Sequence, residues 1–140
     1  MKAVLNMSFC DCRFVKLNMA GNISGSSMHA FERDSHSWDE QINIKIAHPT
    51  LGFNIDTFIQ LYDPPLPTHI KLDVDSTEKE ILEGAAGLLA KGQVKSIWVE
   101  VDGALERERN QGIIAALEVM GYAANHTKGR TRNLEFLPKG

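Results

Sequence analysis

Cysteine is scarce in this sequence, and the two that occur, Cys10 and Cys12, are one residue apart. If this segment is a strand, both thiols lie on one face, because side chains alternate along a strand. Two thiolates cannot complete a tetrahedral zinc site, and His29 and His36 match no known spacing of zinc ligands. We therefore expect reduced cysteines and assign no residue to a metal site.

Long apolar runs and an excess of basic residues are missing as well. No run approaches the roughly 20 apolar residues that cross a bilayer. The start MKAVLNMSFCDCRF has neither an uninterrupted apolar segment nor a small-residue cleavage site. The formal net charge of −3 leaves no basic stripe for phosphates. We expect a cytoplasmic protein with a small or neutral substrate and with no membrane or nucleic-acid partner.

What the sequence does have is the composition of an ordinary globular domain. It contains 140 residues, of which 43% are hydrophobic and 24% are charged. This length is typical of one domain with one core. We therefore treat residues 1–140 as a single domain.

The first third of the chain predicts strands and loops. Residues 3–9 are mostly apolar, and residues 14–19 alternate apolar with polar side chains, which is typical of a strand. Residues 21–41 are rich in turn-forming and polar side chains, so we expect an exposed connection that carries substrate contacts. Residues 42–46 alternate isoleucine with polar residues, which predicts a half-exposed strand before a turn over residues 49–52.

The central segment predicts two strands joined by a helix. GFNIDTFI leads into a short helix, and a proline-rich link then delivers the chain into HIKLDV, which has the alternation of a strand. Ser76 or Thr77 can cap a helix that ends at Gly92, and the spacing of Thr77 and Glu80 is that of a capping box. Residues 94–101 are rich in β-branched and aromatic residues and predict a second strand. A unit of this kind pairs its strands in parallel through a right-handed crossover.

The last third predicts a helix followed by a hairpin. Apolar residues recur at helical spacing over residues 106–120, and Gly121 ends that helix. Residues 122–127 and 133–137 flank the turn-like KGRTR, which indicates a closing antiparallel hairpin. The expected fold class is α/β, with parallel strands, a C-terminal antiparallel hairpin and extra N-terminal strands.

Both predicted parallel strands end in acidic residues. Asp73 and Asp75 close the first strand, and Glu100 and Asp102 close the second. In open α/β sheets, ligands bind outside the carboxyl ends of the parallel strands. Carboxylates at this place can orient a substrate, act as a general base or hold a hard cation.

Structural roles compete with these assignments at several positions. Asp75 either belongs to the site or begins the helix, where a negative charge complements the helix dipole. Glu78 has the position of a first-turn helix charge. The glycines of GNISGSSMH lack the lysine of a phosphate-binding loop, so we expect a flexible loop there. His29, in this loop, is either structural or a substrate contact.

Several motifs together resemble the second half of the FkbM-type methyltransferases. In chain order they are GFNIDTFI, a proline-rich link, HIKLDVDSTEKEILEGA, VKSIWVEV and RNLEFL. The resemblance covers essentially residues 1–140, and its specific part is residues 54–101. It implies a partial Rossmann-like sheet and S-adenosylmethionine as the methyl donor. It also implies transfer to an oxygen of a small molecule or sugar.

The resemblance also implies roles for individual residues. Asp73 would lie next to the transferring methyl group and bind the cofactor together with Asp75. Asp73 and Glu100 would be the catalytic residues. Glu78 and His29 would contact the methyl acceptor, a small molecule. The enzyme would mainly position donor and acceptor and remove a proton from an acceptor hydroxyl.

The sequence departs from the family pattern in two ways. Ser76 stands where the family usually has glycine, and the glycine-rich turn and ribose-binding acid of the cofactor half are not in the sequence. A parallel sheet without these strands exposes an edge, which dimerisation or the N-terminal strands would have to cover. Two alternatives therefore remain, namely a non-catalytic fragment and a dimerising interaction module.

Overall fold

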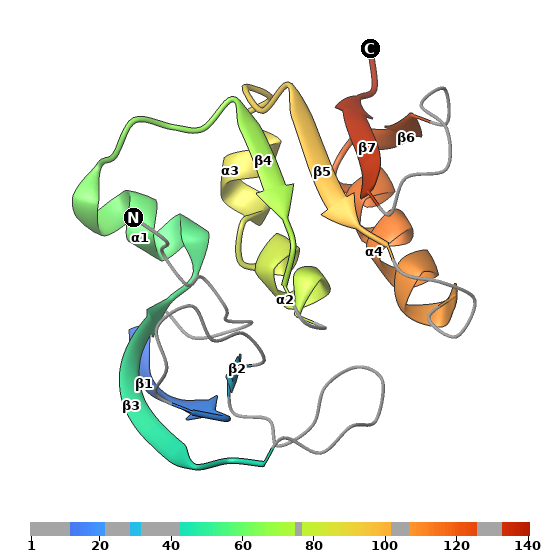
Figure 1. Ribbon diagram of the computed structural model, residues 1–140. Coiled ribbons are helices and arrows are strands. Elements are labelled where there is room, and N and C mark those ends of the chain that lie inside the picture. Colours follow the sequence, from blue (N-terminus) through green and yellow to red (C-terminus); the bar gives the residue numbers. More distant parts are fainter. Residues whose placement is uncertain (1–11, 22–28, 32–42, 75–76, 102–106, 126–132) are drawn as a thin grey trace.

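The computed structural model describes residues 12–21, 29–31, 43–74, 77–101, 107–125 and 133–140 (Figure 1). In these ranges the chain is mixed α/β and contains two sheets, of three and four strands. The mixed α/β class is therefore confirmed. The strand expected at residues 3–9 lies outside the described residues, and none of the described helices is long and apolar enough to cross a membrane.

The N-terminal strands form an antiparallel sheet of their own. Strand β1 (Cys12–Met19) lies between β2 (His29–Phe31) and β3 (Ile46–Phe53). The strand expected at residues 14–19 is confirmed. The turn expected at residues 49–52 is wrong, because β3 continues through this segment and pairs Thr50 with Val15. A proline at position 49 is tolerated there because β3 is an edge strand of this sheet.

Helix α1 (Ile55–Tyr62) follows β3 and confirms the short helix expected from GFNIDTFI. Its start is set by Asn54, whose side chain accepts a hydrogen bond from the N–H group of Thr57 at 2.6 Å. The helix ends at Asp63, which has a left-handed backbone conformation with φ of 44°. Aspartate is among the residues that adopt this conformation most readily. From there the proline-rich link leads to the second sheet.

The second sheet is mixed, with strand order β4-β5-β7-β6. Its strands are β4 (His69–Leu72), β5 (Ser96–Glu100), β6 (Tyr122–Asn125) and β7 (Asn133–Pro138). β4 and β5 pair in parallel, and β7 pairs in antiparallel fashion with both β5 and β6. The parallel pair and the C-terminal hairpin are therefore confirmed, but β7 lies between β5 and β6 although it follows both in the chain.

The crossover between β4 and β5 contains two short helices, α2 (Glu78–Glu83) and α3 (Ala86–Ala90). The prediction of one continuous helix is wrong, because the chain turns at residues 84–85. Thr77 is the N-cap residue of α2, but its side chain makes no capping hydrogen bond, so the expected capping box is not formed. Helix α4 (Arg107–Val119) confirms the last predicted helix.

Asp56, in the first turn of α1, explains why the chain turns before α3. Its Oδ2 accepts a hydrogen bond from the N–H group of Gly87 at 2.7 Å, and its Oδ1 accepts one from that of Leu88 at 2.8 Å. The N–H group of Asp56 donates to the carbonyl oxygen of Gly84 at 3.0 Å. The first N–H groups of a helix have no partner within it, so the carboxylate of another helix caps α3.

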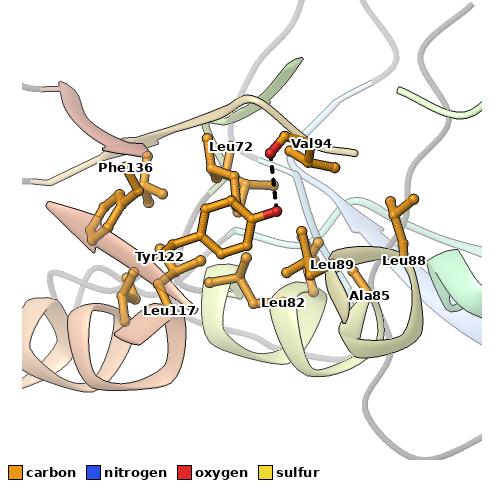
Figure 2. Packing of buried hydrophobic residues seen from close by; sticks show 13 residues of the cluster. Leu72, Leu82, Ala85, Leu88, Leu89, Val94, Leu117, Tyr122 and Phe136 are labelled. Carbon is orange, nitrogen blue, oxygen red and sulfur yellow. Dashed lines mark hydrogen bonds between the residues drawn. The ribbon is translucent and has the colours of Figure 1, made fainter. Parts of the chain in front are cut away.

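Helices α2, α3 and α4 cover one face of the second sheet and form the core with it (Figures 1 and 2). Along β5, Ile97 and Val99 are fully buried on this face, whereas Trp98 between them faces the other way. The N-terminal sheet contributes no residue to this cluster. The buried core residues are Leu72, Ile81, Leu82, Ala85, Leu88, Leu89, Val94, Ile97, Val99, Ile113, Leu117, Tyr122 and Phe136.

Tyr122 carries the one hydrogen bond drawn within this core in Figure 2. Its hydroxyl donates to the carbonyl oxygen of Val94 at 3.1 Å. Burial raises the pKa of Tyr122, so the phenol stays protonated and remains a donor at neutral pH. Its stabilising effect is complete below the usual tyrosine pKa and is lost as the pH rises through the raised value.

Replacement of Tyr122 by phenylalanine should lower the free energy of unfolding by about 1–2 kcal/mol, because the buried carbonyl of Val94 loses its donor. Urea denaturation would measure the change. Tyr62→Phe is the matched control, because Tyr62 is exposed on α1, and its effect should stay within about 0.5 kcal/mol. Equal effects of the two substitutions would contradict a role of the hydrogen bond in stability.

Candidate functional site

The acidic residues at the strand ends lie at one edge of the second sheet. Asp73 follows β4 directly, and Glu100 is the last residue of β5. The two strands are parallel and pair Leu72 with Val99, so the next positions along both strands are Asp73 and Glu100. Leu72 and Val99 are buried against the helices, so both carboxylates belong to the opposite side of the sheet. The structure therefore brings the two predicted catalytic residues to the same place.

Lys71 lies beside these two acids. The sequence alone did not single it out. Its Nζ forms an ion pair with Oδ2 of Asp73, two residues along the strand. The hydrogen bond and charge of Asp73 raise the pKa of Lys71 above its ordinary value, and the charge of Glu100 acts in the same direction. Lys71 is therefore protonated throughout the neutral range, and on the alkaline side its charge is lost as the pH rises through the raised pKa.

Lys71 could have been found from the alternation of HIKLDV. In a strand with buried Leu72, residues 71 and 73 necessarily share the other face. A lysine placed two positions before an acid is then close enough to pair with it.

We call the side of the four-stranded sheet opposite to the helices the second face. A row of three paired residues crosses it, one from each of β4, β5 and β7. Lys71 pairs with Trp98, and Trp98 pairs with Glu135 of β7. Glu135 is buried and accepts a hydrogen bond from the side-chain nitrogen of Asn125 at 2.8 Å. Trp98 is half-buried on this face rather than part of the helix-covered core. The row leads from the strand-end carboxylates across the sheet.

Glu78 lies beside the candidate site in sequence but is not exposed there. It is the first residue of α2, and only 1% of its surface is accessible. A carboxylate at this position interacts favourably with the helix dipole. The position of Glu78 at the start of α2 therefore agrees with its interpretation as a first-turn helix charge. Contact with a methyl acceptor stays a prediction for Glu78.

The remaining predicted site residues cannot be placed as side chains. Asp75 and Asp102 lie outside the described residues. The backbone of His29 begins β2, opposite Met19 of β1, and its side chain also lies outside what is described. The roles of Asp75 and His29 therefore stay predictions.

A histidine–serine pair lies at the other end of the parallel strands. Nδ1 of His69 and Oγ of Ser96 are 2.8 Å apart, and these residues begin β4 and β5. Ser96 is buried, which makes it a poor nucleophile for an external substrate. The pair links the two strands at their amino ends, away from Asp73 and Glu100.

Figure 1 shows what surrounds the carboxyl ends of the strands. The arrows of β4 and β5 point toward the side of the molecule on which the three-stranded sheet lies. The N-terminal sheet is therefore on the side where an α/β sheet binds its ligand. Among the described residues, no group of three or more histidine, cysteine or acidic side chains is arranged to hold a metal ion.

Comparisons with models of protein families, with curated proteins and with solved structures found no match.

Proposed function

We propose that this chain is a methyltransferase of the FkbM type that uses S-adenosylmethionine and transfers its methyl group to an oxygen of a small molecule or sugar. The observation that carries the proposal is the meeting of Asp73 and Glu100 at the carboxyl ends of a parallel strand pair. This is where α/β sheets place their ligands. HIKLDVDSTEKEILEGA, which carries the family resemblance, supplies the first of these residues and its helix.

The second sheet supports a partial Rossmann-like arrangement. Its parallel strands are connected through α2 and α3, and β5 is followed by α4 and then β6. β6 runs in the same direction as β5, because β7 is antiparallel to both. Three strands of common direction, with their helices packed on one face, are consistent with one half of a doubly wound sheet.

The residues at the strand ends fit one part of the proposed cofactor. S-adenosylmethionine carries positive charges on its sulfonium and amino groups, and the carboxylates of Asp73 and Glu100 complement them. The adenosine part has less support. The described glycines with positive φ are Gly92 and Gly121, which follow α3 and α4 rather than a strand. We therefore assign only the methionine end of the cofactor to this part of the chain.

S-adenosylmethionine, when bound, supplies an electrophilic methyl group. Asp73 would hold a cationic part of the donor, and its ion pair with Lys71 would orient the carboxylate. Glu100 would accept the proton of an acceptor hydroxyl, which requires it to be ionised and within hydrogen-bond reach of that hydroxyl. Positioning of the two reactants would provide most of the rate enhancement.

Isothermal titration calorimetry with S-adenosylmethionine tests the proposal. We expect binding by the unaltered chain and a roughly 10- to 100-fold weaker affinity for Asp73→Asn, because a charge-assisted interaction is removed without a change of shape. Glu83→Gln, which removes an equally acidic group from the surface of α2, is the matched control and should change the affinity less than about threefold. No heat at high protein concentration would overturn cofactor binding by this chain.

A further inference from the structure

Among the described strands, β4 is an edge of the second sheet. In the part of the chain that the structure describes, its strand neighbour is β5 on one side, and the N-terminal strands pair among themselves instead of with β4. The outer N–H and C=O groups of an edge strand are a template for pairing with another chain.

The residues along this edge have a symmetric pattern about Leu72. Lys71 and Asp73 flank it with opposite charges on the second face. Ile70 and Val74 flank it one step further out, and both are half-buried and packed against the core. When two such strands run antiparallel with Leu72 opposite Leu72, each lysine lies opposite an aspartate. Each apolar residue then lies opposite an apolar residue.

We propose that two copies of this chain associate by antiparallel pairing of their β4 edges, centred on Leu72. Directly opposed residues of antiparallel strands share a face of the sheet. Lys71 therefore lies opposite Asp73 of the second copy, and the two-fold axis repeats this pair. Ile70 lies opposite Val74 of the second copy on the helix-covered face. The two half-buried side chains then shield each other further from solvent.

The self-complementary pattern favours a second copy over an unrelated strand. In a two-fold interface, residue i contacts residue j and residue j contacts residue i, so a strand must match its own reversed pattern. IKLDV satisfies this condition for charge and for hydrophobicity. The proposal does not depend on methyl transfer. It would place the two Asp73 carboxylates close to the same symmetry axis.

The predicted association is weak. A pairing of about five residues buries far less than the roughly 1,200 Å² of a stable interface, so we expect a dissociation constant of about 0.1–1 mM. Exposed ion pairs are screened by salt, so the association should weaken as the ionic strength rises.

Sedimentation velocity over a concentration series up to about 1 mM would measure the association. Residue 71 of each copy lies opposite residue 73 of the other, so Lys71→Glu and Asp73→Lys each create two pairs of like charges. We expect each substitution to weaken the dimer by at least about tenfold. The double variant Lys71→Glu/Asp73→Lys restores opposite charges in reversed order, so its dissociation constant should return to within about threefold of the original value.

Two controls separate this interface from other effects. Lys91→Glu changes the same charge on an exposed residue after α3 and should leave association unchanged, and thermal unfolding would show that the variants are folded. A chain that stays monomeric over the whole series would overturn the proposal. Association that the single charge reversals leave intact, as expected for contact through the exposed Phe14, would also overturn it, as would a double variant that is not restored.

Discussion

Replacement of Phe136 by alanine is expected to lower the free energy of unfolding by about 3–5 kcal/mol. Phe136 is fully buried and lies on β7 between Ile97 of β5 and Ala124 of β6. It therefore packs where the parallel pair and the C-terminal hairpin meet (Figure 2). Truncation to alanine removes buried apolar area and leaves a cavity. The cavity cannot collapse easily, because β7 is held by hydrogen bonds to β5 on one side and to β6 on the other. Domains of this size are stable by about 5–15 kcal/mol, so the loss is a large share of the total.

Chemical denaturation followed by circular dichroism would measure this effect. Leu137→Ala is the matched control, because Leu137 is the next residue of β7, points to the opposite face and is 38% exposed. Its effect should stay below about 1 kcal/mol. Similar losses for the two neighbours would show that the helix-covered face is not the main core.

Replacement of Asp56 by alanine should lower the free energy of unfolding by about 2–3 kcal/mol, because α3 loses two charge-assisted hydrogen bonds at its start. Asp56→Asn should have an intermediate effect, since an amide offers one oxygen where the carboxylate offers two. Gln60→Ala, at an exposed position of the same helix, should change stability by less than about 0.5 kcal/mol. Chemical denaturation would distinguish these three outcomes.

Gly87 provides a sharper test of the same contact. A Cβ atom at this position would lie 2.9 Å from Oδ2 of Asp56, so Gly87→Ala should destabilise the protein by about 1–3 kcal/mol. In the Asp56→Ala background the clash is gone, and alanine should be neutral or stabilise α3 by up to about 1 kcal/mol. A double-mutant cycle measures this coupling, and effects that add within about 0.5 kcal/mol would contradict the cap.

The parts of the fold that the sequence predicted are those with strong local signals. β5 is rich in β-branched and aromatic residues, α4 has apolar residues at helical spacing, and Gly121 follows α4 in a positive-φ conformation of 89°. The hairpin of β6 and β7 is bounded by turn formers. In each case the residues that specify the element lie within it or beside it.

The wrong predictions arose where distant contacts override local ones. Pro49 and Gly52 are turn formers, but pairing with the whole of β1 keeps β3 extended through them. The crossover helix has continuous apolar spacing, but the carboxylate of Asp56 caps a second helix after residues 84–85. Local propensities are weak, and tertiary contacts of this kind regularly exceed them.

The candidate site was predicted in part for the same reason. Asp73 and Glu100 follow predicted parallel strands, so their shared edge could be inferred from the strand–helix–strand pattern alone. The ion pair of Lys71 with Asp73 and the influence of Glu100 on the pKa of Lys71 depend on the register of β4 against β5. The burial of Glu78 depends on how α2 packs, which its position in the first turn did not indicate.

By itself, the sequence determined the parallel crossover between β4 and β5, helix α4, the closing hairpin and the acids at the strand ends. Hydrophobic period, glycine and proline act over a few residues, so these features can be predicted from neighbouring positions. Only the tertiary structure decided that β7 lies between β5 and β6, that the N-terminal strands form a separate sheet, and that Asp56 caps a helix 32 positions away. These features depend on contacts between distant segments, which form only when the chain packs.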